Sequence, residues 1–361
     1  MLNYFESIHC YNLPVEEVRL ALALGIIISV LFYDRWRLTN GSMAVAGYMA
    51  IFIDRPIYII STIALGITTY FLVQKIIARK MFLYGRRRLV VMVLVGMALQ
   101  LINAFCISLA FNREVLWEGN LWGLGLSLYQ GSLYGIGFVL IGLIAQDIER
   151  QGVCMTVLTL LSTSFLTFLI LQIILVLKIF LPTYWGSTST YQDTGMVFYS
   201  YNLNLLIIAV ILSVIASSLL FDRTGIRSGG FLTAAYAALF IFMPLQLVFI
   251  IGVSLFVYFF VTHVLMPYLP IFGRTKFAMM VLASLVFMWI LEAFASYISR
   301  STFVLFPGFS LITPMMAALI ANDSERQNLS KTLVGFITCT LVVFALIWAI
   351  DIGRTIFLLK F

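Results

Sequence analysis

Residues 32–56, FYDRWRLTNGSMAVAGYMAIFIDRP, return later in the chain as residues 220–244, LFDRTGIRSGGFLTAAYAALFIFMP. One constant offset in residue number, 222 − 34 = 188, pairs the distinctive positions of the two stretches without a gap: Asp34 with Asp222, Gly41 with Gly229, Tyr48 with Tyr236 and Pro56 with Pro244. Runs of apolar residues alone would not align aspartate, glycine, tyrosine and proline at one spacing. The pattern therefore predicts an internal duplication, which governs every later inference about the fold.

A second motif recurs at a different offset. The segment AQDIERQ (145–151) returns as ANDSERQ (321–327), and here the offset is 323 − 147 = 176. The first copy is therefore longer than the second by the difference between the offsets, 188 − 176 = 12, and we place this insertion between positions 112 and 134. We expect an N-terminal tail (1–17), a first membrane repeat (18–181), a polar linker (182–202), a second membrane repeat (203–354) and a C-terminal tail (355–361).

The composition indicates that most of the protein's surface faces lipid and not water. Hydrophobic residues make up 62% of the chain and charged residues only 10%, whereas a soluble domain carries roughly 25% charged residues. So few charges cannot cover a surface that faces water, but they suit helices in lipid, which satisfy their own backbone hydrogen bonds. The net charge of +7 fits basic loops beside apolar spans rather than binding to nucleic acid. Two histidines are too few for a His-rich metal site, and we expect no cofactor.

Apolar segments long enough to cross a bilayer recur in both copies. We expect an all-α integral membrane protein, a polytopic helical bundle of two parallel repeats with roughly 10–12 membrane segments. Basic clusters should face the cytoplasm. For this to hold at both Arg35 and Arg86, the short apolar piece 43–53 must cross outward and the span after Pro56 must return, which gives six crossings per copy. If the short pieces are re-entrant, the number of crossings is smaller.

The short, proline-terminated pieces are candidates for broken helices at a repeat interface. Paired interrupted segments of this kind point to a binding or passage site in membrane transport proteins. Tight helix packing is the alternative explanation, because small residues allow close approach in membranes. The residues concerned are Gly47, Tyr48, Pro56, Tyr236 and Pro244.

Two polar motifs are candidates for contact with a partner or an anionic polymer. The first is the arginine cluster Arg86, Arg87 and Arg88, with Arg274 and Lys276 in the second copy. Guanidinium groups suit carboxylates and phosphates, although a basic loop that only sets orientation would look the same. The second comprises Asp147, Glu149 and Arg150, with Asp323, Glu325 and Arg326. A loop in which the aspartate caps the next helix is the alternative there.

The chain carries no GxSxG, HExxH or GxxxxGK[ST] motif, so we do not expect it to be an enzyme by itself. A membrane enzyme that uses a bare Asp or Glu base stays open.

Three segments of the first copy, AVAGYMAIFIDRP (44–56), KMFLYGRRRLVVMVLVGM (80–97) and GLIAQDIERQG (142–152), occur in an order that resembles a known family. It is the PgsC/CapC family, the small membrane subunit of the poly-γ-glutamate synthesis and export machinery. The second copy matches more loosely, since it lacks the triple arginine and has Asn328 in place of the final glycine. The usual family member is a single unit, whereas this chain holds two.

The resemblance implies a role in a bacterial inner-membrane complex. The subunit would anchor a cytoplasmic ATP-dependent amide ligase and help an anionic polymer to pass outward, with a further membrane-anchored extracytoplasmic subunit as a second partner. The residues themselves leave two alternatives open: a secondary transporter for a small anion, or a membrane-embedded acyl- or glycosyltransferase.

Overall fold

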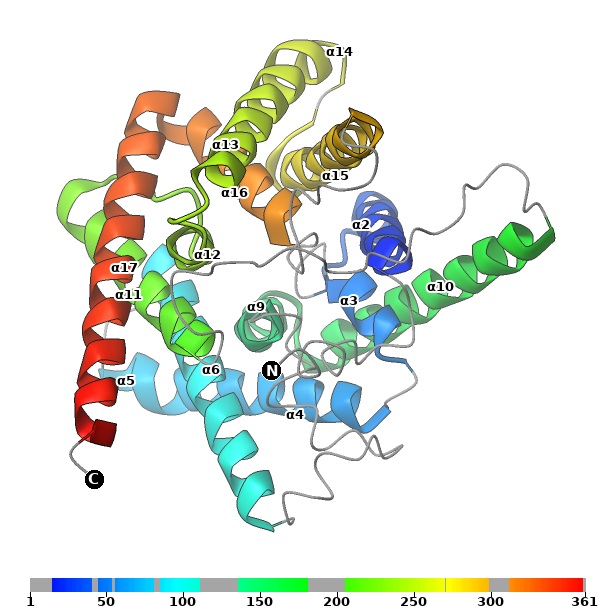
Figure 1. Cartoon of the computed structure of the whole chain (residues 1–361). Helices are drawn as coiled ribbons and strands as arrows, with labels where there is room; N and C mark the ends of the chain where they lie inside the picture. Colours follow the sequence, from blue (N-terminus) through cyan, green and yellow to red (C-terminus); the bar gives the residue numbers. More distant parts are fainter. Residues whose placement is uncertain are drawn as a thin grey trace. The chain divides into compact units, whose positions relative to one another are not determined.

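A computed structural model describes residues 15–40, 45–53, 56–80, 85–110, 136–180, 205–269, 271–298 and 312–359. The chain divides into two compact units, residues 1–191 and 192–361. Within the described residues every regular element is a helix (Figure 1). The predicted linker and the predicted insertion lie outside these residues, so the domain bounds stay predictions, although helix α17 continues into the predicted C-terminal tail as far as Leu359.

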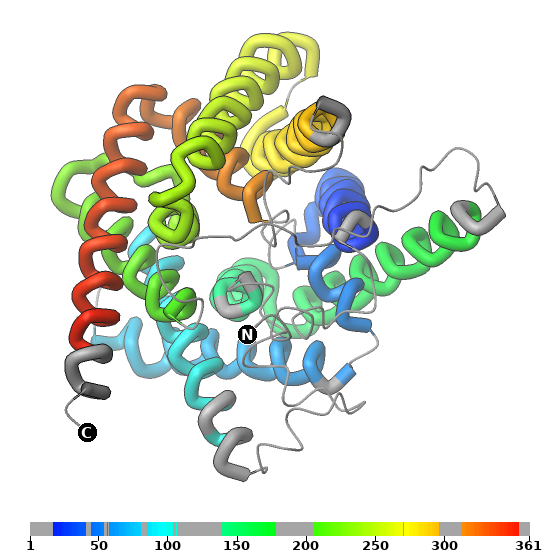
Figure 2. Tube along the Cα trace, in the orientation of Figure 1, coloured from blue at the N-terminus to red at the C-terminus, as the bar shows by residue number. Residues whose placement is uncertain are grey.

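The first unit contains repeat 1. Its elements are α2 (Val15–Trp36), α3 (Val45–Ile51), α4 (Pro56–Leu72), η1 (Val73–Ile77), α5 (Ala78–Lys80), α6 (Gly85–Ala110), α9 (Ile136–Gln151) and α10 (Val153–Phe180). Helices α2, α3 and α10 pack against one another, and α9 packs against α4 and α6. Figure 2 follows the chain through α4, η1 and α5 as one continuous rod.

The second unit contains repeat 2. Its elements are α11 (Leu206–Thr224), α12 (Thr233–Leu239), α13 (Pro244–Phe259), η3 (Phe260–Leu265), α14 (Met266–Tyr268), α15 (Gly273–Ile298), α16 (Ile312–Gln327) and α17 (Leu329–Leu359). The starts of α3, α4, α5 and α6 recur at the first of the two sequence offsets, and those of α9 and α10 recur at the second. The duplication is therefore confirmed, including its change of offset. Even the π-helical turns η1 and η3 occupy equivalent places.

The short apolar pieces are helices of only seven residues, α3 and α12. At 1.5 Å per residue each is about 10 Å long, against a hydrocarbon core of about 30 Å. In repeat 1 the chain runs back alongside α2: the Asn40 side chain donates a hydrogen bond to Ser29, and Gly47 lies against Ala21 and Leu22. Asn40 and helix α3 thus lie alongside α2, and the broken-helix interpretation stays a prediction.

Contact between α2 and α3 depends on two glycines. A Cβ atom on Gly25 would lie 2.2 Å from the backbone nitrogen of Gly47, and a Cβ on Gly47 would lie 2.6 Å from the Ala21 carbonyl oxygen. Backbones approach this closely in membranes where small residues permit it. The tight-packing explanation for this segment therefore holds in repeat 1.

The segment AQDIERQ is not a loop. Residues 145–151 form the last turns of α9, and residues 321–327 form those of α16. The helix-capping explanation for Asp147 and Asp323 was wrong, because both lie inside these helices. Each helix is instead ended by one residue in the left-handed region, Gly152 (φ 85°) and Asn328 (φ 82°). Asparagine tolerates that conformation better than other non-glycine residues, which explains why it can replace the glycine.

Six helical segments in the described residues are long and apolar enough to cross a bilayer. They are 58–80 and 153–177 in repeat 1, and 206–224, 244–268, 273–295 and 329–353 in repeat 2. Many of their large apolar side chains are exposed, such as Phe165 on α10 and Leu341 on α17, as lipid-facing residues should be. The chain is an all-helical, multi-pass membrane protein; six crossings per repeat remains a prediction.

Candidate functional site

The charged site residues predicted in repeat 1 cluster where α6 begins and α9 ends, and we call this end of the repeat the basic end. There α6 begins with Gly85-Arg86-Arg87-Arg88, and α9 finishes with Glu149-Arg150-Gln151. Antiparallel packing of α6 on α9 brings the two motifs together. The positive end of the α6 dipole adds to the field of the arginines, and Arg150 stands at the negative end of α9. The first turn of α6 is thus a centre of positive potential.

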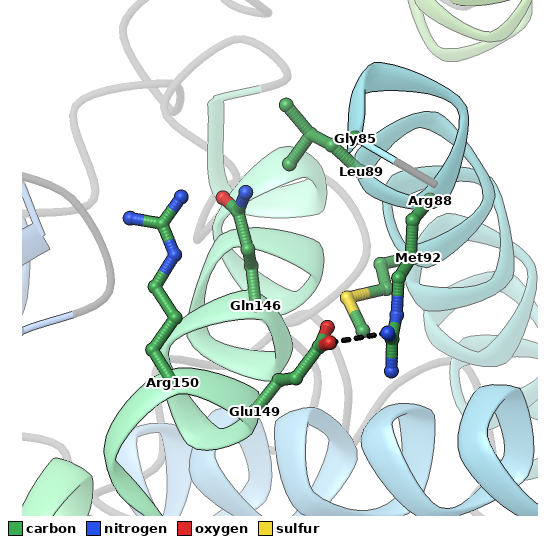
Figure 3. Close-up of a pocket in the computed structure, with 7 residues that line it drawn as sticks. All are labelled: Gly85, Arg88, Leu89, Met92, Gln146, Glu149 and Arg150. Carbon is green, nitrogen blue, oxygen red and sulfur yellow. Dashed lines mark ion pairs between the residues drawn. The ribbon is translucent and has the colours of Figure 1, made fainter. Parts of the chain in front are cut away.

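Arg88 links the two helices. Its Nη1 lies 2.5 Å from Oε1 of Glu149, as drawn in Figure 3, and its Nη2 donates to the side chain of Gln74 in η1. The Arg88 Nε is buried and makes no hydrogen bond within the described part of the chain. Both partners of the ion pair keep about a quarter of their side-chain surface exposed, 24% and 26%.

A half-open pocket with a cavity volume of about 190 Å³ lies over this ion pair. Figure 3 shows it between α6 and α9, with Arg150 and Gln146 projecting from α9. Its floor is apolar, since Met92 is fully buried in a cluster with Val73 and Ala145. The lining residues are Gly85, Arg88, Leu89, Met92, Gln146, Glu149 and Arg150. The structure thus joins three of the predicted residues, Arg88, Glu149 and Arg150, in one pocket.

Repeat 2 contains the equivalent ion pair in a changed form. Lys276 replaces Arg88 and binds Glu325, the equivalent of Glu149. The Lys276 side chain is only 9% exposed, so this cation is more deeply buried than Arg88. A second ion pair joins Arg227 to Asp323 at 3.6 Å.

The remaining predicted polar residues differ in exposure. Asp147 is buried, with 1% of its surface exposed, so it lies within the helix packing and not on a surface. Arg86 and Arg274 are half-buried. Arg87 and Arg326 are exposed. Their roles in binding remain predictions.

A glutamine at the end of α9 and another at the end of α16 hold the extended chain that follows the first helix of each repeat. Gln151 accepts a hydrogen bond from the backbone N–H of Thr39 at 2.9 Å and donates to the carbonyl oxygen of the same residue. Gln327 makes the same two bonds to Arg227, both at 2.7 Å. These glutamines were not among the predicted site residues, although their recurrence in AQDIERQ and ANDSERQ was a visible signal.

Three of the predicted broken-helix residues, Gly47, Tyr48 and Tyr236, are buried within their own repeats, whereas Pro56 and Pro244 are exposed. Tyr48 is buried, and its hydroxyl lies 2.9 Å from that of Tyr58. Tyr236 is fully buried in α12. Pro56 and Pro244 are the first residues of α4 and α13, where a missing N–H costs nothing. Gly47 packs against α2 as described above. Whether these segments also meet at a repeat interface stays a prediction.

No group of three His, Cys, Asp or Glu side chains that could hold a metal ion occurs among the described residues.

Comparison with known proteins gives one consistent family. The pattern of the family described as "Capsule biosynthesis CapC" matches residues 24–157 and again residues 208–333. The chain is 29% identical over 158 residues to "Capsule biosynthesis protein CapC" of Bacillus anthracis, which covers 44% of this chain and 95% of that protein. It is 26% identical over 156 residues to "PGA biosynthesis protein CapC" of Bacillus subtilis (strain 168), which covers 43% of this chain and 94% of that protein.

Each relative therefore has about the length of one repeat. No solved structure matches the chain. Because the family pattern matches twice and covers most of both repeats, this protein belongs to the capsule biosynthesis CapC family, as a tandem duplication of the unit.

Proposed function

We propose that this chain, a membrane subunit of poly-γ-glutamate capsule synthesis, anchors a cytoplasmic ATP-dependent amide ligase through the basic ends of its repeats and guides the anionic polymer across the bacterial cytoplasmic membrane. The relatives named for capsule and PGA biosynthesis support the process. A complex with other capsule-synthesis subunits follows from that process. We propose the ligase and a membrane-anchored extracytoplasmic subunit as its members.

One observation carries the proposal: the same polar bridge occurs at the same end of both repeats. In each copy a basic residue in the first turn of α6 or α15 pairs with a glutamate in the last turn of α9 or α16, Arg88 with Glu149 and Lys276 with Glu325. In each copy the glutamine two residues after that glutamate binds the backbone after the first helix. A basic end held by these contacts suits a docking platform for a cytoplasmic partner and attracts a polyanion.

Co-purification tests the proposal. The tagged chain would be isolated from a capsule-forming host in mild detergent, and its partners would be identified by mass spectrometry. We expect recovery of an ATP-dependent amide ligase. A triple variant with Arg86, Arg87 and Arg88 changed to alanine should recover several-fold less ligase and restore less capsule to a deletion strain.

The matched control is the triple variant with Arg86, Arg87 and Arg88 changed to lysine. It keeps the positive charge at the start of α6, so ligase recovery should stay closer to that of the parent chain than in the alanine variant. Isolation of a stable, monodisperse chain with no ligase would contradict the proposal.

A further inference from the structure

The equivalent ion pairs of the two repeats differ in how firmly they are held. In repeat 1 the Arg88 and Glu149 side chains are 24% and 26% exposed. In repeat 2 the Glu325 side chain is 22% exposed, close to Glu149, but the Lys276 side chain is only 9% exposed. The neighbouring Asn322 is buried where repeat 1 has the half-buried Gln146.

This difference in exposure decides which ion pair can open to accept another charged partner. A partly exposed ion pair is weak, because water solvates both charges once they separate. A pair with one deeply buried member cannot open without leaving an uncompensated charge in a poorly solvated place. Opening Arg88 from Glu149 therefore costs less than opening Lys276 from Glu325.

The repeat 1 pocket also has donors to offer an incoming acceptor. The Arg88 guanidinium lines the pocket, and its Nη1, which now pairs with Glu149, would become available to an incoming carboxylate. Arg150, which is exposed, stands on the opposite wall, with Gln146 beside it (Figure 3). The Glu149 side chain, a carboxylate on a short aliphatic stem, already pairs with Arg88. It therefore indicates that an incoming ligand should also carry a carboxylate. A volume of about 190 Å³ is small beside sites for drug-sized ligands and suits one residue of a polymer.

The surrounding charges point to the same repeat. Arg79, Lys80 and Arg87 of repeat 1 stand where repeat 2 has Pro267, Tyr268 and Thr275. The repeat whose ion pair is more exposed therefore also has the stronger positive field.

We infer that Arg88 and Glu149 form an exchangeable contact: a free carboxylate of the anionic polyamide displaces Glu149 from Arg88 and binds in the repeat 1 pocket. The Lys276–Glu325 pair of repeat 2 is a fixed structural contact. The identity of the polymer rests on the proposed function, but the exchange rests on the geometry of the pocket. In this arrangement the ion pair of repeat 1 contacts the polymer, whereas the ion pair of repeat 2 stabilises the fold.

Binding of a defined probe tests the inference. The full chain in detergent would be titrated against a fluorescently labelled γ-linked glutamate oligomer. The matched control probe is the neutral γ-linked isoglutamine oligomer, in which each free α-carboxylate is replaced by a carboxamide. Removing the competing carboxylate by Glu149→Gln should tighten binding of the acidic probe by up to about five-fold, which corresponds to about 1 kcal/mol. Arg88→Gln should weaken binding, and Arg88→Lys should recover only part of the loss.

Glu325→Gln gives the contrast between repeats, since it should lower the melting temperature without tightening binding. The inference is overturned if Glu149→Gln leaves the affinity unchanged or lowers it, if Glu325→Gln tightens binding to the same extent, or if the neutral probe binds as well as the acidic one. Because Glu149→Gln is expected to gain affinity, misfolding cannot imitate the expected result. Recovery of the ligase is measured separately, so the proposed function and this exchange can fail independently.

Discussion

Replacing Gln327 by alanine should destabilise repeat 2 by removing the hydrogen bonds that hold the extended chain after α11. The carboxamide accepts one bond from the Arg227 backbone N–H and donates another to its carbonyl oxygen, both at 2.7 Å. It also donates to Thr332 Oγ1 at 2.9 Å. Alanine preserves the helix and removes all three bonds.

The size of the effect follows from what is left behind. The Thr332 hydroxyl keeps its bond to the Asn328 carbonyl at 3.0 Å, so its loss is small. The two backbone groups of Arg227 lose their partner, and an unsatisfied buried group costs about 1–3 kcal/mol. Since Gln327 is half-buried, water offsets part of this, and about 1 kcal/mol per group gives a loss of about 2 kcal/mol. For a unit of this size the melting temperature should fall by about 4–8 °C.

A buried thiol in the same repeat provides the assay. Cys339 in α17 is buried, whereas Cys106 and Cys154 of repeat 1 are exposed. In a chain whose other three cysteines are changed to serine, a thiol-reactive fluorophore should label Cys339 only as repeat 2 opens. The labelling midpoint during heating then reports the stability of that repeat, compared at one scan rate because membrane proteins often unfold irreversibly.

Arg326→Ala is the matched control, because Arg326 is the preceding residue on the same turn and is exposed. Exposed positions of this kind change stability by about 0.5 kcal/mol or less. If Gln327→Ala moved the midpoint no further than Arg326→Ala, the glutamine bridge would contribute nothing to stability, and the extended chain would have to be held by its other contacts.

Three further predictions concern repeat 1 and the topology. Gly152→Asn should cost less than about 1 kcal/mol, because Asn328 adopts the same left-handed conformation, whereas Gly152→Val should cost clearly more in the same melting assay. Gly25→Ala should sharply lower the yield of monodisperse protein, since its Cβ would lie 2.2 Å from a backbone nitrogen; normal yield and melting would refute the glycine contact. If each repeat crosses the membrane six times, an impermeant maleimide on intact cells should label a Ser187→Cys variant in the linker but not the exposed Cys154.

The duplication could be predicted from the sequence because it needs only identities at a fixed spacing. Asp34 with Asp222 and Pro56 with Pro244 were enough to establish the first offset, and helix starts at both offsets confirm it. That the chain is a membrane protein could likewise be predicted from its low content of charged residues. Composition and spacing are properties of the chain alone, so no knowledge of contacts was required.

The contacts within the site were not predictable in the same way. Glu149 and Gln151 lie close together on one helix, yet one pairs with Arg88 on α6 and the other binds Thr39 after α2. Which partner each side chain meets depends on the packing of three helices, which one sequence does not reveal. The interpretation of residues 145–151 as a loop failed for a related reason: the polar residues suggested exposure, whereas Asp147 and Ile148 are buried against neighbouring helices.

The two repeats serve as an internal comparison that separates what the fold requires from what one copy has kept for itself. The glutamine bridge, the ion pair, the left-handed junction and the π-helical turn occur in both copies, so each belongs to the architecture of the unit. Arg87 and the exposed form of the ion pair occur only in repeat 1. The fold does not need these features, since the other repeat lacks them, and they lie around a pocket. A direct role in binding is therefore their best explanation.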